Sequence, residues 1–401
     1  MSDSHQVTDP AVPAVAVLLG PDARGLCAAA VEMAGGTLTS LRTTQIRYVP
    51  SASIVVQYSA AVAWAGGGST RETVVASAGR EVPDGVAVLS ADGMDIAMWR
   101  FPNDPYLPGL ASAMDGQRAG ELLASLGAQP GETQLRTRAY RPGRRAVVEV
   151  AGHGGRIYLK VVRPDRVAAL QARHVALAAY VPVPHSLGWS AELGIVALQA
   201  LPGRPIRKAL EAKSRRLPDG AGLVALLDQF PPAESEPQVV SGPIDHAPRH
   251  GKLLAAVAPQ AAGRIDEILD NLTVAPGLAV PVHGDFHSGQ VLADGEHITG
   301  LVDVDTSGVG QRADDLAVML GHLSTLGLMS PARGVIDRYG ARLIAAFDRL
   351  TDPAELRLRV AGAVLGLATG PFRIQEARWP RGTEARIALA ERWIAAADDI
   401  R

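Results

Sequence analysis

The sequence predicts an α+β protein with a strand-rich first half and a helical second half. Residues 36–78 alternate β-branched and apolar runs with turn residues, which is typical of an antiparallel meander. From about residue 206 onward, apolar residues recur at helical spacing, as in 251–272 and 332–350. Segregated strands and helices indicate α+β architecture, with a cleft expected between the two parts.

Length and charge narrow the class of protein. The chain has 401 residues, which at roughly 150 residues per domain suggests two to three domains. Its 39 Lys and Arg nearly balance its 41 Asp and Glu, with no block of like charge, so we expect no nucleic-acid partner. The single cysteine, Cys27, excludes an intramolecular disulfide and a thiolate zinc cluster.

The sequence carries no targeting or membrane signal. The N-terminus has no basic region of the kind that opens a signal peptide. No apolar run approaches the roughly 20 residues that a membrane helix needs. We therefore expect a cytoplasmic protein with no membrane association.

The pattern of the first meander returns 92 residues further along the chain. The matched residues are Tyr48, Pro50, Val55 and Val56 in the first copy and Tyr140, Pro142, Val147 and Val148 in the second. Either one segment is a diverged duplicate of the other, or two unrelated meanders happen to use the same turn residues. The sequence leaves both interpretations open.

The remaining elements follow in order. Residues 98–114 are punctuated by proline and indicate a linker that opens a helix near Ala111. A helix after Val162 is expected to end at Pro182 and Pro184, and a buried strand follows near 194–200. Within the helical half, 279–305 is an exception. It carries two strand signals, Gln290–Ala293 and Ile298–Val304, around an Asp-Gly turn.

The densest polar cluster lies at His283–Gln290, followed after the predicted hairpin by Asp303. A short loop and then a strand-turn-strand can place Asp285, Gln290 and Asp303 around one point. Gln290 and Asp303 offer oxygen ligands only, which Mg²⁺ prefers. Asp285, left off the metal, could accept the proton of an attacking hydroxyl. For His283 we expect a hydrogen bond that braces the loop.

Lys160 is the second candidate, because it lies within the apolar strand Tyr-Leu-Lys-Val-Val. A buried ammonium needs an anionic partner, and a nucleotide phosphate would supply one. The alternative interpretation is a lysine whose head group reaches solvent from a strand edge.

Together these motifs resemble the aminoglycoside phosphotransferase and choline kinase superfamily, which has a bilobal protein-kinase-like fold. The family's catalytic loop, H-G-D followed by an amide, is matched by His283–Asp285 and Gln290. Its metal-binding strand is matched by Asp303, and its downstream acidic helix start by Asp315. The turn 140–145, Lys160 and the hinge 198–203 match its nucleotide lobe.

The resemblance implies roles for individual residues. Lys160 and the turn residue Gly143 would bind the phosphates of ATP. Gln199 and Leu201 would present hinge backbone groups to the adenine. Gln290 and Asp303 would bind Mg²⁺, and Asp285 would act on the acceptor hydroxyl. These roles, assigned by resemblance, fall on Gly143, Lys160, Gln199, Leu201, Asp285, Gln290 and Asp303.

The resemblance also implies a domain order and a substrate class. We expect a β-rich cap over 1–105, a linker helix over 106–133, a nucleotide-binding lobe over 134–203 and a helical lobe over 204–401. The Gly-Gln ending of the loop, where most of the family has Asn, is similar to the maltokinase and glucosamine-kinase branch. This predicts a kinase, as monomer or homodimer, for a hydroxyl of a sugar, amino sugar or aminoglycoside. Asp314 and Glu376 are the candidate acceptor-binding residues.

Three other interpretations stay open. Gln290 in place of Asn, and His174 where the family has a glutamate partner for the strand lysine, allow a pseudokinase-like module that binds nucleotide or sugar without transfer. The D-x-D-x-S sequence at 303–307 is typical of a phosphatase nucleophile, but fewer than 100 mostly helical residues follow it. The pair His283 and His287 around Asp285 has zinc-hydrolase-like spacing, without a second histidine cluster in the sequence.

Overall fold

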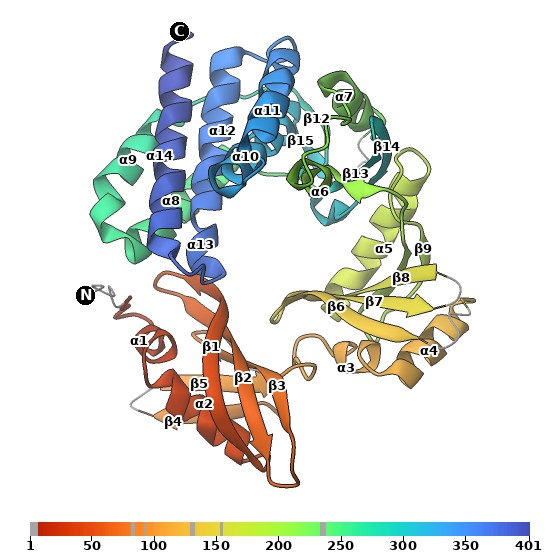
Figure 1. The fold of residues 1–401 in the computed structure, drawn as a ribbon, viewed down its shortest axis with the longest axis vertical. Coiled ribbons are helices and arrows are strands. Elements are labelled where there is room, and N and C mark those ends of the chain that lie inside the picture. Colours follow the sequence, from red (N-terminus) through yellow and green to blue (C-terminus); the bar gives the residue numbers. More distant parts are fainter. Residues whose placement is uncertain (1–6, 82–84, 92–93, 129–132, 153–154, 233–237) are drawn as a thin grey trace. The chain divides into compact units, whose positions relative to one another are not determined.

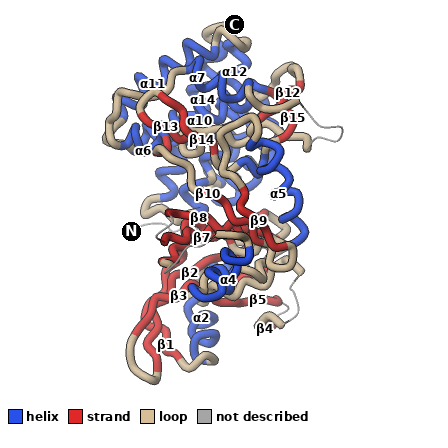
Figure 2. Tube along the Cα trace, turned by 90° about the vertical axis from the view of Figure 1, so that its right-hand side faces the viewer, coloured by secondary structure: helices blue, strands red, loops and turns tan. Residues whose placement is uncertain are grey.

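The computed structural model describes residues 7–81, 85–91, 94–128, 133–152, 155–232 and 238–401 (Figure 1). The chain forms two compact units. The first comprises Met1–Ala168, Leu187–Leu198 and Pro371–Trp379, and the second comprises Ala169–Ser186, Gln199–Gly370 and Pro380–Arg401. The first unit contains two five-stranded sheets, and most helical residues lie in the second (Figure 2). The predicted α+β class is confirmed.

The first sheet is an antiparallel meander, as expected for 36–78, and two short helices precede it in the sequence. Its elements are α1 (Ala14–Leu19), α2 (Ala23–Glu32), β1 (Gly36–Val49), β2 (Ser53–Trp64), β3 (Ser69–Ala78), β4 (Ala87–Ala91) and β5 (Met94–Arg100). The strand order is β1-β2-β3-β5-β4. The buried hydroxyl of Tyr58 donates to the Leu18 carbonyl at 2.7 Å, which ties one face of the sheet to α1.

The second sheet has the same strand order as the first. Its elements are α3 (Leu110–Ala113), α4 (Gly116–Ser125), β6 (Gln134–Arg141), β7 (Arg145–Gly152), β8 (Gly155–Val162), α5 (Pro164–Ala178), β9 (Ser186–Ser190) and β10 (Ile195–Gln199). The order is β6-β7-β8-β10-β9, and two helices again precede the sheet in the sequence. The first hairpins also share a register, with Tyr48 opposite Ile54 and Tyr140 opposite Ala146. Because the two sheets share strand order and the register of the first hairpin, a duplication is favoured over two unrelated meanders with the same turn residues.

The linker between the sheets forms two short helices, where the sequence predicted one over 106–133. Asp115 separates them, since its carboxylate accepts the Arg118 N–H at 2.9 Å and caps α4. The predicted division into cap, linker, nucleotide lobe and helical lobe stays a prediction.

The second unit is mainly helical. They are α6 (Ile206–Glu211), α7 (Gly220–Asp228), α8 (Pro243–Val257), α9 (Ala262–Asn271), α10 (Arg312–Met329), α11 (Arg333–Phe347), α12 (Pro353–Ala368), α13 (Gly370–Arg373) at the unit boundary and α14 (Trp379–Asp398). Helices α10 and α12 pack side by side through fully buried aliphatic residues such as Leu316, Leu320 and Val364. No helix in the described ranges combines the length and apolarity needed to span a membrane.

In the described part of the chain, five short strands accompany these helices and form one three-stranded and one two-stranded sheet. They are β11 (Arg204–Pro205), β12 (Ala279–Val282), β13 (Val291–Asp294), β14 (His297–Leu301) and β15 (Gly308–Gln311). The predicted hairpin around the Asp-Gly turn is confirmed as β13–β14. Its second strand ends at Leu301 instead of Val304, because the Val302 N–H donates to the Gln290 carbonyl and Asp303 takes a left-handed conformation at φ 60°.

Candidate functional site

The loop 283–290 joins β12 to β13 and is fixed at its start by Asp315 of α10. The two oxygens of this buried carboxylate accept the N–H groups of His283 at 2.7 Å and Gly284 at 2.8 Å. Gly284 has φ +80°, and a Cβ there would lie 2.8 Å from the Thr306 carbonyl oxygen. The left-handed turn and the close approach together require glycine.

His283 braces the loop, as predicted. Its Nε2 donates to the Val302 carbonyl at 3.1 Å, and its Nδ1 accepts the Asp285 N–H at 3.2 Å. The imidazole is therefore held in its neutral Nε2–H tautomer, since a carbonyl accepts only and an N–H donates only. The hydroxyl of Thr306 also donates to the His283 carbonyl, at 3.1 Å.

The loop presents Asp285 between two anchored residues. Phe286 is fully buried, and the side chain of Asp285 is 43% exposed. The backbone N–H of Asp285 is held by His283, as described above. The carboxylate thus starts from a fixed backbone position and remains accessible, which a group that accepts a proton from a bound substrate needs.

Gln290 and Asp303 are brought together at the end of the loop. The Gln290 Nε2 lies 3.4 Å from the Asp303 Oδ2, and their backbones are linked through Val302. Turning the amide group over would place its oxygen beside the carboxylate. An amide oxygen and a carboxylate at one point fit a hard divalent cation such as Mg²⁺. The arrangement fits the metal-binding prediction for both residues.

A third histidine, which the sequence did not reveal, completes a cluster around Asp285. Asp285, His287 and His322 each place one potential ligand atom within 4.8 Å of the others. The rings of His287 and His322 stack with centroids 4.0 Å apart. His322 lies seven residues after Asp315, so two turns of α10 put both residues on the face toward the loop.

This cluster does not have the protonation of a zinc site. The Nδ1 of His287 accepts the Gly289 N–H at 3.0 Å, so Nε2 carries the proton, at 3.8 Å from the Asp285 carboxylate. A metal on that nitrogen would need the proton removed. Burial lowers the pKa of His287 to about 4 and that of His322 well below its ordinary value, so both rings are neutral at pH 7.

Lys160 and Gly143 lie in the first unit, on β8 and at the β6–β7 turn. Lys160 is buried, and its neighbours Leu159 and Val161 face the core formed with α3 and α4, so Lys160 points to the opposite face of the sheet. Gly143 has φ +65°, and its N–H donates to the buried Asp104 carboxylate at 2.7 Å. Phosphate binding by this turn would therefore use other groups than the Gly143 N–H.

The predicted hinge residues Gln199 and Leu201 lie in the second unit. The Gln199 N–H donates to the His185 carbonyl at 2.9 Å, so Gln199 would offer its carbonyl to a nucleotide base. His174, at the position expected for a glutamate partner of Lys160, is buried in α5, and its Nδ1 donates to the Pro184 carbonyl at 3.0 Å.

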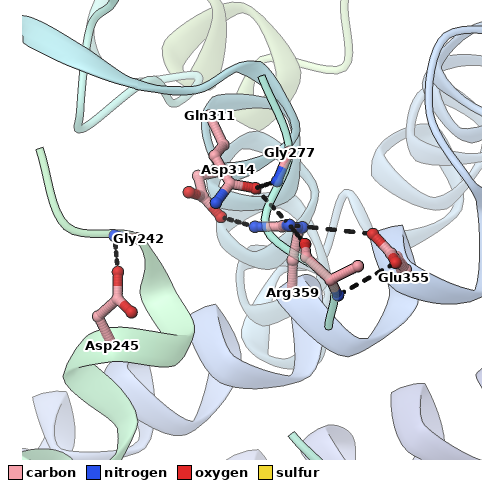
Figure 3. A network of polar contacts seen from close by, with 8 residues as sticks. Gly242, Asp245, Gly277, Gln311, Asp314, Glu355 and Arg359 are labelled. Atoms are coloured by element: carbon pink, nitrogen blue, oxygen red, sulfur yellow. Dashed lines mark hydrogen bonds and ion pairs between the residues drawn. The ribbon is translucent and has the colours of Figure 1, made fainter. Parts of the chain in front are cut away.

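The two predicted acceptor residues belong to different units. Asp314 lies in the second unit with its side chain 16% exposed, and its carboxylate accepts from Arg359 at 2.7 Å (Figure 3). Arg359 also donates to the Gln311 side chain at 2.6 Å and lies 3.9 Å from Glu355. This network joins α10 to α12, and its buried arginine was not found from the sequence. Glu376 is half-buried in the first unit. Acceptor binding by either residue stays a prediction.

Comparisons with known proteins give a family match. The model of a phosphotransferase enzyme family matches residues 136–358, and no curated protein matches the chain. Among solved structures, the macrolide 2'-phosphotransferase MphH from Brachybacterium faecium is similar at 20% identity, over 68% of this chain and 97% of its own, with a TM-score of 0.43. A thermostable mutant of aminoglycoside phosphotransferase APH(4)-Ia, in ternary complex with AMP-PNP and hygromycin B, is similar at 15% identity, over 69% and 98%, with a TM-score of 0.49.

Proposed function

Because the chain belongs to the phosphotransferase enzyme family, we propose that it transfers the γ-phosphoryl group of ATP to a hydroxyl of a small molecule. The observation that supports this proposal is the approach of the Gln290 amide to the Asp303 carboxylate, at the end of the same loop that holds the backbone of Asp285. Such transfer depends mainly on positioning and on neutralising charge, so a few fixed oxygen groups and one base suffice.

In the proposed reaction, Asp285 orients the acceptor hydroxyl and takes its proton. The acceptor oxygen forms a bond to the γ-phosphorus, the bond from that phosphorus to the bridging oxygen breaks, and ADP leaves. The backbone of the base is fixed through His283, which Asp315 holds in turn. The loop therefore limits the motion of the carboxylate before the substrate binds.

Gln290 and Asp303 are the residues that would hold Mg²⁺, and Lys160 is the residue that would bind the nucleotide phosphates. When bound, Mg²⁺ neutralises charge on the phosphates. Lys160 is buried in its strand, and the ammonium would form charge-assisted hydrogen bonds to phosphate oxygens.

For the acceptor we propose a sugar, an amino sugar or an aminoglycoside. The support is the resemblance of the loop ending at Gln290 to the sugar-kinase branch. Asp314 pairs with Arg359, and both Asp314 and Glu376 remain candidates in this proposal for binding an acceptor amine or hydroxyl. We propose that the enzyme works as a monomer or homodimer.

The proposed function is tested by incubating the full chain with γ-labelled ATP and Mg²⁺ against maltose, glucosamine and kanamycin. We expect label to appear in at least one acceptor, and omission of Mg²⁺ to abolish it. Nucleotide binding is measured in parallel by calorimetry. ATP binding without a labelled product from any acceptor would contradict transfer to this class and favour the binding-module interpretation.

A further inference from the structure

An arginine-lined pocket lies within the first unit. It opens between strands β1 and β2 and the turn that joins β6 to β7. Its enclosed space is about 20 Å³, enough for one oxygen-sized group, and about 320 Å³ when the open mouth is included. The polar side chains of its wall are those of Gln45, Arg47, Gln57, Arg141, Arg144 and Arg373.

Two residues of the pocket wall have buried polar atoms that lack a hydrogen-bond partner among the described residues. Arg47 of β1 and Gln57 of β2 lie on the same face of the first sheet, since Arg47 pairs with Val55 and Gln45 with Gln57. The Arg47 Nη2 and the Gln57 Oε1 are buried, and in the part of the chain that the structure describes neither has a hydrogen-bond partner. Leaving such atoms unsatisfied costs roughly 1–3 kcal/mol each, more for a charged group.

The two largest charge contributions at Arg47 come from other arginines. Burial, together with repulsion from Arg80 and Arg144, lowers the pKa of Arg47 to about 10, against opposing contributions from Tyr106 and Asp104. The Asp104 carboxylate already accepts from the Gly143 N–H, the Tyr106 N–H and the Tyr140 hydroxyl.

Arg80 adds a further cation beside the pocket. Its guanidinium lies over the Tyr106 ring at 5.1 Å, and among the described residues its buried Nη1 has no hydrogen-bond partner. The same Nη1 would lie 3.3 Å from a Cβ on Gly143, so Arg80 contacts the β6–β7 turn. Arg47 and Arg80 thus each hold a buried guanidinium nitrogen without a hydrogen-bond partner among the described residues, close to the other arginines of the pocket wall.

We propose that this pocket binds a phosphate-type oxyanion. A tetrahedral oxyanion offers several acceptors to guanidinium groups that approach from different directions, and its charge offsets the repulsion among them. The Gln57 amide can turn its nitrogen toward the anion, because the two ends exchange by rotation of the last torsion. The anion would link β1 and β2 to the β6–β7 turn, because arginines from both sides line the pocket.

The phosphate could be a free ion or part of a nucleotide, since the turn 141–145 is the one that resembles a phosphate loop. The site does not depend on the proposed transfer reaction. It depends on the buried donors of Arg47 and on the charge that Arg144 and Arg80 place beside them.

The test is a calorimetric titration of the full chain with inorganic phosphate, at constant ionic strength and without nucleotide. Arg47→Gln and Arg144→Gln should each weaken phosphate binding about tenfold or more, since each removes charge-assisted hydrogen bonds. Arg42→Gln, on an exposed position of β1, is the matched control and should leave the affinity unchanged. Circular dichroism confirms that each variant is folded.

A second titration, with saturating ADP, distinguishes the two sources. If ADP displaces the phosphate and Arg47→Gln also weakens ADP binding, the anion is the phosphate of the nucleotide. If phosphate binds beside ADP with unchanged affinity, the anion is an independent ligand. Absence of binding at millimolar phosphate, or equal affinity in the wild type and both pocket variants, would overturn the proposal.

Discussion

The carboxylate of Asp315 accepts the backbone N–H of His283 at 2.7 Å, with both groups buried. Its other oxygen accepts the Gly284 N–H, so one side chain from the first turn of α10 fixes the start of the loop that carries Asp285. The distance in sequence between the two is 32 residues. The geometry of the proposed base thus depends on packing between α10 and β12.

Removing this carboxylate should destabilise the fold. Asp315→Ala leaves the N–H groups of His283 and Gly284 buried without an acceptor, and we expect the free energy of unfolding to fall by about 2–4 kcal/mol. Chemical denaturation measures this. Asp219→Ala, which removes an exposed helix cap, should cost only about 1 kcal/mol and serves as control. Equal losses for the two variants would contradict the anchoring role of Asp315.

The stacked histidines predict a specific pH dependence. The pKa of His287 is lowered to about 4 and that of His322 is also lowered, so the folded state resists their protonation. Their contribution to stability is complete above the ordinary pKa near 6.5 and is lost as pH falls toward 4. Burial acts oppositely on Asp315, whose pKa is raised to about 6, so its protonation favours the folded state as pH falls through the same range.

The two effects are separated by following individual rings. Nuclear magnetic resonance of the His287 ring protons should show no protonation between pH 8 and 5. Between pH 6.5 and 4, the free energy of unfolding should fall more in the wild type than in His322→Phe, which keeps the stack and removes one titrating group. A His287 midpoint near 6.5 would show that the ring is not buried as described.

Lys160 should matter for nucleotide binding and little for folding. Lys160→Met keeps the length of the side chain in β8 and removes its charge, so KM for ATP should rise at least about tenfold through loss of a charge-assisted hydrogen bond. Steady-state kinetics with varied ATP measures this. Lys208→Met, on an exposed turn of α6, should leave KM unchanged, and an unchanged KM in both variants would remove Lys160 from the nucleotide site.

The pair of Asp314 and Arg359 should behave as a structural ion pair. Arg359→Met leaves the largely enclosed Asp314 carboxylate without its cation and should lower the free energy of unfolding by about 2–4 kcal/mol. Adding Asp314→Leu to that variant should restore part of the loss, because the unpaired charge is then gone. Denaturation of the wild type, Arg359→Met, Asp314→Leu and the double variant measures the coupling. Additive losses would show that the two side chains do not interact.

The features found from the sequence are those formed by neighbouring residues. The H-G-D loop, the Asp-Gly hairpin, the brace by His283 and the buried strand lysine all follow from local patterns, and each is present. The sequence repeat, seen in only four matched residue pairs 92 positions apart, agrees with the identical strand order of the two sheets.

The features missed depend on contacts between distant segments. Arg359 meets Asp314 across 45 residues, and Asp104 reaches Gly143 across 39 from a proline-rich linker. Hydrophobic periodicity predicts which face of a helix is buried, but it does not predict which polar residue from another segment contacts that face. For the same reason His322 was not recognised, although it faces the loop from α10.

The central claim is that Asp285 accepts the proton of the hydroxyl that receives the phosphoryl group. The most direct measurement is the rate of label transfer from γ-labelled ATP to a responsive acceptor by the wild type, Asp285→Asn and the exposed control Asp294→Asn, with ATP affinity measured for each. We predict that Asp285→Asn loses at least about 100-fold in kcat with ATP affinity unchanged, and that Asp294→Asn matches the wild type. Transfer by Asp285→Asn at more than a few per cent of the wild-type rate would contradict the account.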